Sequence, residues 1–197
     1  MSFFELPPKT EHHAFEPTAT HQWTGPACNE LGVELPFHLV LGESEAALIR
    51  LQSVTAYEHG LVFNLAARSK WKREPVKRDP VDFTHLFNRA DHMPRSPTFV
   101  RFGLQFRDGS KVTNLTHPPD PFFDDAFQPD QPILIGDPNL YRYDSDGAVD
   151  LNYWLWPLPP GDTLQVVVEW PAEGITETAT DIATTSLLDA AKTDTRF

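Results

Sequence analysis

The stretch from Leu151 to Pro171 constrains the fold more than any other part of the chain, because it holds three of the five tryptophans and two runs of strand-forming residues. Between these runs, residues 157–162 include three prolines and a glycine, which disfavour both a helix and a continuous strand. The second run alternates as a strand with one buried face does, that face being formed by Leu164, Val166, Val168 and Trp170. The stretch therefore predicts a β-hairpin whose apolar face forms the centre of a β-sheet core.

Alternating apolar residues predict further strands along the chain. A first strand is expected near residues 37–41, and strands over 47–57 and 61–67 are expected to form a hairpin that turns near His59. Residues 44–48 could also open a helix, but the alternation that follows them favours a strand. This part of the chain therefore contributes three strands to the predicted sheet.

The clearest alternation covers residues 98–107, and the Asp-Gly pair that follows is a strong hairpin signal. A three-residue loop with a bulge is preferred there, because it places Phe106 opposite Val112 rather than opposite a lysine. Residues 132–136 predict one more short, buried strand.

Two helices are expected outside these strands. Asp79 and Pro80 suit an N-cap and a first helical position, so a short helix is predicted near residues 80–88. The segment 176–192 is rich in alanine and threonine. Within it and just before it, apolar or small residues recur at helical spacing: Ile175, Ala179, Ile182, Ser186 and Ala190. This spacing predicts a C-terminal helix.

These elements together predict an all-β fold. We expect an antiparallel β-sandwich, immunoglobulin-like or jelly-roll-like in layout, with the short helix near 80–88 and the C-terminal helix added to it. The expected organisation has a flexible N-terminal arm over residues 1–22 and a sandwich domain over 23–172. Residues 173–197 are expected to form the helix and tail, packed on the same domain.

The formal net charge of −12 argues against nucleic acid as a partner, because a phosphate backbone would be repelled by most of the surface. The chain shows no signal-peptide pattern and no apolar run long enough for a membrane span, so we expect a cytoplasmic protein without a membrane partner. The single cysteine, Cys28, excludes an internal disulfide and thiolate-cluster metal sites.

Positive charge is concentrated in one segment, residues 68–78, which we expect to be a loop. Its candidate partner-binding residues are Arg68, Lys70, Trp71, Lys72, Arg73, Lys77 and Arg78. A basic loop on an acidic protein can steer an acidic surface towards it, so contact with another protein or a second copy of the chain is the leading functional hypothesis. The alternative is a solvated loop whose charges are neutralised by neighbouring acids.

A second hypothesis is a sandwich that binds a divalent cation or a carbohydrate. Asp144, Asp146 and Asp150 resemble part of a calcium loop, but Leu155 stands where such a loop needs a glutamate. The motif is therefore broken, and no cofactor is expected. Aromatic residues in loops, such as Trp71, Trp154 or Trp156, could instead stack on a sugar ring.

Catalytic motifs are missing from the sequence. It contains no Gly-x-Ser-x-Gly, no phosphate-binding glycine loop, no dinucleotide fingerprint and no His-Glu-x-x-His. A third hypothesis, an unrecognised hydrolase, would have to use loop aspartates such as Asp120, Asp124 and Asp125 together with histidines. We therefore expect a non-enzymatic module and assign no catalytic residue.

Three motifs extend over much of the chain: Trp23-x-Gly-Pro-x-x-Asn-x-Leu-Gly-Val33, Arg101-Phe-Gly-x-Gln-Phe-x-Asp-Gly-x-Lys-Val-Thr-Asn114, and Trp154-Leu-Trp-Pro-Leu-Pro-Pro160 with the later Glu-Trp-Pro171. Together they resemble a group of uncharacterised bacterial proteins of similar length. The group is β-rich and has no assigned activity, cofactor or partner. The resemblance therefore implies a β-rich fold and transfers no functional residue.

Overall fold

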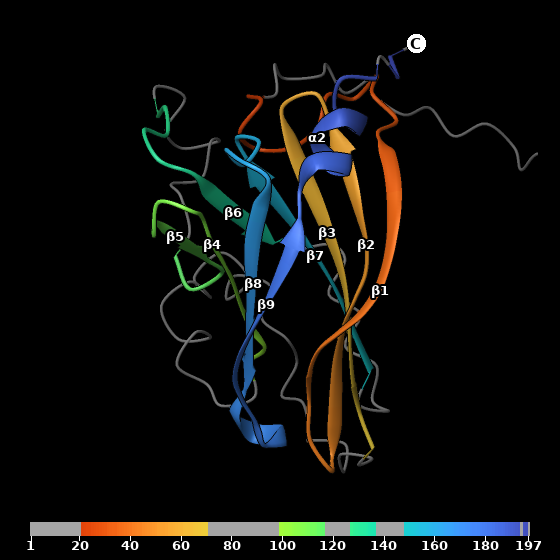
Figure 1. The fold of residues 1–197 in the computed structure, drawn as a ribbon, viewed down its shortest axis with the longest axis vertical. Helices are drawn as coiled ribbons and strands as arrows, with labels where there is room; N and C mark the ends of the chain where they lie inside the picture. The colour runs from red at the N-terminus through yellow and green to blue at the C-terminus, as the bar shows by residue number, and fades with distance from the viewer. Residues whose placement is uncertain (1–20, 71–98, 117–126, 137–147, 194, 197) are drawn as a thin grey trace, which may run out of the picture.

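The computed structural model of the protein describes residues 21–70, 99–116, 127–136, 148–193 and 195–196. These residues form two antiparallel β-sheets that pack against each other, which confirms the predicted all-β sandwich (Figure 1). The first twenty residues of the predicted N-terminal arm and the predicted helix near 80–88 lie outside the described residues.

The larger sheet has five strands in the order β1-β2-β3-β7-β6. These strands are β1 (Val33–Glu43), β2 (Ala47–Tyr57), β3 (Gly60–Ser69), β6 (Ile133–Gly136) and β7 (Ala148–Trp156). β1, β2 and β3 are consecutive antiparallel neighbours, and β2 and β3 form the predicted hairpin with its turn at Glu58 and His59. Alternation along the sequence therefore located these strands, although register shifts interrupt it in β1 and β2.

The smaller sheet has four strands in the order β5-β4-β8-β9. These strands are β4 (Arg101–Gln105), β5 (Lys111–Thr113), β8 (Thr163–Trp170) and β9 (Ile175–Ala183). A short 3-10 turn, η2 (Pro171–Glu173), separates β8 from β9, and a helix, α2 (Thr185–Ala190), follows β9. Figure 1 shows β1 at one side of the molecule and β5 with β6 at the other.

The core lies between the two sheets, because each strand turns one row of apolar side chains inwards. Aromatic rings bridge the layers. Phe102 of β4 stacks on Tyr153 of β7 at 4.8 Å between ring centroids and contacts Phe63 of β3 at 5.8 Å. Such pairs add about 0.5–1.5 kcal/mol to the stabilisation from burial itself. The two sheets are thus held together by a continuous apolar layer.

The predicted hairpin over residues 151–171 is wrong, although both of its strands exist. β7 belongs to the five-stranded sheet and β8 to the four-stranded sheet, so residues 157–162 cross from one layer to the other. Prolines cannot donate ladder hydrogen bonds, and a six-residue link is long enough to span the roughly 10 Å between packed sheets. The apolar faces of both strands do point into the core, as expected.

The predicted C-terminal helix over residues 176–192 is also largely wrong. Residues 175–183 form β9, and only Thr185–Ala190 are helical. Threonine and isoleucine favour strands, and β9 completes the backbone hydrogen bonds of β8 along its length. The sandwich therefore extends beyond residue 172, where the sequence placed its boundary.

The turn between β4 and β5 differs from the predicted one in its register. Leu104 lies opposite Val112, and the backbone N–H of Phe106 donates to the oxygen of Ser110 at 2.9 Å. The loop has three residues, with Gly109 at a φ of 86° that suits glycine. The predicted pairing of Phe106 with Val112 is wrong, because the turn closes on Phe106 and Ser110.

Candidate functional site

Of the basic segment 68–78, the structure describes only the first three residues. Arg68 donates through Nη1 to the backbone oxygens of Ala67 and Val149, both at 2.9 Å, and through Nη2 to Asp150 Oδ1 at 2.6 Å. Lys70 donates through Nζ to the backbone oxygen of Glu45 at 2.7 Å. Both cations therefore bind acceptors within the chain. The other predicted partner-binding residues, Trp71, Lys72, Arg73, Lys77 and Arg78, lie outside the described residues.

The predicted calcium ligands are only partly described. Asp150 forms the ion pair with Arg68, whereas Asp144 and Asp146 lie outside the described residues. Within the described ranges, no group of three or more histidine, cysteine, aspartate or glutamate side chains is arranged to hold a metal ion. The same ranges contain no helix that is long and apolar enough to cross a membrane.

Trp154 is not available as a platform for a sugar ring. It lies on the outer face of β7, since its neighbours Tyr153 and Leu155 enter the core. The ring is nevertheless 6% exposed, because the turn that carries Trp23 covers it, and its Nε1 donates to the backbone oxygen of Trp23 at 3.1 Å. Trp156, on the same face, is half-buried.

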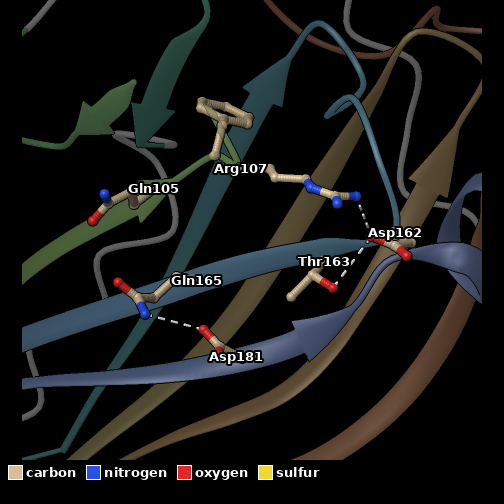
Figure 2. A pocket seen from close by; sticks show the side chains of 7 residues that line it. Gln105, Arg107, Asp162, Thr163, Gln165 and Asp181 are labelled. Atoms are coloured by element: carbon tan, nitrogen blue, oxygen red, sulfur yellow. Dashed lines mark hydrogen bonds and ion pairs between the residues drawn. The ribbon is translucent and has the colours of Figure 1, made fainter. Parts of the chain in front are cut away.

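A polar pocket of about 410 Å³ lies at one end of the four-stranded sheet (Figure 2). It is lined by Gln105, Phe106, Arg107, Asp162, Thr163, Gln165 and Asp181. We call the six polar residues among them the polar shelf. They come from β4, from β8, from β9 and from the two loops beside these strands. Figure 2 shows their side chains around an open space above the strands.

The strand register brings three of these side chains into one row. Gln105 of β4 lies opposite Gln165 of β8, and Gln165 lies opposite Asp181 of β9. Side chains of directly opposed residues point to the same face of a sheet. The neighbouring residues Leu104 and Val166 are buried in the core, so this row faces outwards.

Asp162 is held in place because it ends the link of residues 157–162 that crosses between the sheets. The backbone N–H of Thr184 donates to the oxygen of Asp162 at 2.9 Å, and its buried hydroxyl donates to the oxygen of Gly161 at 2.8 Å. These bonds fix the end of the link against the start of α2. Thr184 thereby sets the position of Asp162 at the rim of the pocket.

Internal hydrogen bonds order the shelf without using all of its donors and acceptors. Gln165 Nε2 donates to Asp181 Oδ1 at 3.0 Å, while Arg107 Nη1 lies 3.6 Å from Asp162 Oδ1 (Figure 2). The side chains of Arg107 and Asp162 are 77% and 69% exposed, so their ion pair contributes little to stability. The arrangement leaves these groups able to turn towards a ligand.

The shelf has the chemistry of a binding surface. Its amides both donate and accept hydrogen bonds, its carboxylates accept and its guanidinium donates. One cation and two carboxylates give it a formal charge of −1. Phe106 is 4% exposed, so its ring offers little area for stacking. The hydroxyl of Thr163 donates to Asp162 Oδ1 at 3.4 Å, and both groups lie on the rim of the pocket.

Sequence reasoning did not find this site. The sequence predicts the strands that carry Gln105 and Gln165, but nothing in it shows that these strands are neighbours. Asp181 was assigned to a helix. The available signal was the alternation in each strand, and the missing one was the strand order.

The chain was compared with protein-family models, with curated proteins and with solved structures, and none of these comparisons found a match. The resemblance to a group of bacterial proteins therefore stays a prediction, and the function has to be argued from the residues of the site.

Proposed function

We propose that this protein is a β-sandwich binding module that holds a neutral, hydroxyl-rich ligand of the carbohydrate class on its polar shelf. The observation that carries the proposal is the pocket of about 410 Å³ whose polar lining comes from three adjacent strands. Pockets of roughly 300–1,000 Å³ are usual for small ligands. Side chains anchored on strands are also better positioned than side chains on free loops.

The chemistry of the lining favours hydroxyl groups as the recognised feature. A hydroxyl both donates and accepts, and the amides of Gln105 and Gln165 can meet both functions. Asp162 and Asp181 accept from hydroxyl donors, and Arg107 donates to hydroxyl oxygens. A ligand with many hydroxyls can therefore be bound in a definite orientation without carrying a charge.

Charge argues against anionic ligands. The shelf carries a formal charge of −1 and the whole chain −12, so phosphorylated or sulfated ligands would be repelled. The scarcity of exposed aromatic surface in the pocket implies modest affinity, roughly in the millimolar to micromolar range. Such affinity is typical of a module that recognises rather than transforms its ligand.

The test is a titration of isotopically labelled protein with a panel of neutral mono- and disaccharides, followed by amide NMR shifts. We expect shifts at Gln105, Gln165 and Asp181, and their loss in the double variant Gln165→Ala/Asp181→Ala. The matched control is Glu177→Ala, which also removes an acid from β9 but lies outside the pocket lining. If no neutral sugar shifts the shelf resonances, the proposal is wrong.

Contact with another protein through residues 68–78 stays a prediction, as do the cytoplasmic location and the immunoglobulin-like or jelly-roll-like layout. Arg68 is paired with Asp150 and Lys70 binds a backbone oxygen, which favours a neutralised charge at Arg68. The two hypotheses use different residues and can be tested separately.

A further inference from the structure

The row of polar side chains on the four-stranded sheet continues beyond the pocket. Gln105 of β4 lies opposite Lys111 of β5, which is the edge strand on that side. The complete row is Lys111, Gln105, Gln165 and Asp181, with one residue from each strand. It therefore runs from one edge of the sheet to the other.

The length of this row exceeds that of the pocket. Neighbouring strands lie about 4.8 Å apart, so three intervals between four strands span roughly 14 Å. The pocket lining includes only the last three members, which span roughly 10 Å. Lys111 thus adds a hydrogen-bond donor one strand beyond the residues that line the pocket.

The next row of residues on the same face has small side chains. It consists of Gly103 of β4, opposite Thr113 of β5 and Val167 of β8, and then of Ala179 of β9. The Thr113 side chain lies over Gly103, since a Cβ added there would be 3.1 Å from its methyl carbon. None of the four residues is larger than valine, so an elongated ligand can lie along the polar row without meeting a bulky side chain in this neighbouring row.

We propose that the shelf binds a linear neutral oligosaccharide laid across the four strands, with Lys111 contacting a unit beyond those held by Gln165 and Asp181. This inference rests on the proposed function and specifies the shape of its ligand. A repeating chain of hydroxyl-bearing units matches a repeating row of donors and acceptors. A peptide fits this face less well, because an extended peptide satisfies its backbone by pairing along a sheet edge rather than across a face.

Binding several units at once makes affinity depend on chain length. Each added unit that reaches another member of the row binds at the high effective concentration set by its neighbours. Affinity should rise by about tenfold or more from the monomer upwards, and level off once the chain is as long as the row.

The experiment is a calorimetric titration with neutral oligomers, from monomer to hexamer, of α-1,4-glucose, β-1,4-glucose and β-1,4-N-acetylglucosamine. At least one series should show the rise and the plateau. Lys111→Ala should then weaken binding of the longer oligomers severalfold and leave the monomer unchanged, whereas Lys192→Ala, on the exposed end beyond α2, should change neither.

The outcomes separate this inference from the proposed function. If the monomer binds and longer chains bind no better, or if Lys111→Ala has no effect on them, the linear ligand is wrong and the binding module stands. If no oligomer binds, both are wrong. A lysine- and arginine-rich peptide is titrated in parallel, and its binding at the shelf in place of sugars would also overturn both.

Discussion

The side-chain amide of Asn114 donates a hydrogen bond of 2.8 Å to the hydroxyl of Tyr153, and it does so between the two sheets. Asn114 follows β5 and is 3% exposed. The same amide donates to the backbone oxygen of Val100, and its Oδ1 accepts from the backbone N–H of Phe102, both at 2.9 Å. One polar side chain thereby satisfies three buried groups in an apolar core.

We predict that Asn114→Ala lowers the free energy of unfolding by about 3 kcal/mol, because it removes a hydrogen bond from each of those buried groups. Tyr153→Phe removes one hydroxyl and keeps the ring stacked on Phe102, so it should cost about 1 kcal/mol. Urea denaturation of both variants and of the double variant measures the coupling between them. Equal costs for the two single variants would contradict the central role of Asn114.

Gly60 predicts a second stability difference. A Cβ atom at this position would lie 2.4 Å from the backbone oxygen of Leu155 and 2.5 Å from the Trp154 ring. Backbone of a central strand cannot easily move away, so Gly60→Ala should destabilise the protein by about 2 kcal/mol. The control is Gly25→Ala, where a Cβ would meet nothing within 4 Å and thermal unfolding should hardly change. Similar melting temperatures for the two variants would refute the close approach.

Tyr57 predicts a loss of stability at high pH. Burial raises the pKa of its hydroxyl above 10.0, and the nearby carboxylates of Glu30 and Glu34 raise it further. The unfolded chain releases this proton near pH 10 while the folded protein still holds it. The stabilisation is therefore complete below about pH 10 and is lost as pH rises through the folded pKa.

The measurement for Tyr57 is chemical denaturation at several pH values between about 8 and 11. Wild-type stability should fall more steeply with rising pH than that of Tyr57→Phe, which lacks the titrating group. Other tyrosines and lysines contribute equally to both curves, so their difference isolates Tyr57. Parallel curves would mean that this hydroxyl titrates alike in both states.

The contact hypothesis for residues 68–78 has its own test. Replacing Lys70, Lys72, Arg73, Lys77 and Arg78 by glutamate should abolish any partner captured at low salt and lost as salt rises. Affinity capture with the wild-type and the variant chain, compared by mass spectrometry, gives the answer. Recovery of the same partners at the same salt concentrations would disprove the hypothesis. The variant Gln165→Ala/Asp181→Ala is the control, because it changes the polar shelf and retains the basic segment.

Alternation predicted most strands but not their sheets. The period of two in β8 shows which residues face the core, and it holds whether the strand pairs with β7 or with β4. The hairpin across residues 157–162 was inferred because consecutive strands usually pair. The three prolines that suggested a turn instead accompany a crossing between layers.

The helix expected over residues 176–192 shows a second limit. Ile175 and Ile182 are seven positions apart, which suits two turns of a helix. In β9 both are buried, although residues seven apart in a regular strand point to opposite faces. A register shift between Val168 and Trp170 of β8 lies between the two isoleucines and turns both towards the core. The same two isoleucines therefore fit either structure, and pairing with β8 decided between them.

The candidate site was hidden for the same reason. Gln105, Gln165 and Asp181 are distant in the sequence and meet only through strand order. Trp154 shows the opposite error: it was expected in a loop and available for stacking, but it lies in β7 and the turn at Trp23 covers it. A side chain on the outer face of a sheet is exposed only where no other segment of the chain covers it.

The crossing of the chain between layers has a consequence for how the protein folds. β6 and β7 of the larger sheet lie in the sequence between β5 and β8 of the smaller one. Dividing the chain at any one point therefore cannot separate the strands of one sheet from those of the other. The β4–β8 pair also joins residues far apart along the chain. Such long-range pairing slows folding, since much of the chain must be ordered before these contacts form. The two layers should therefore assemble and come apart together, in one slow cooperative step.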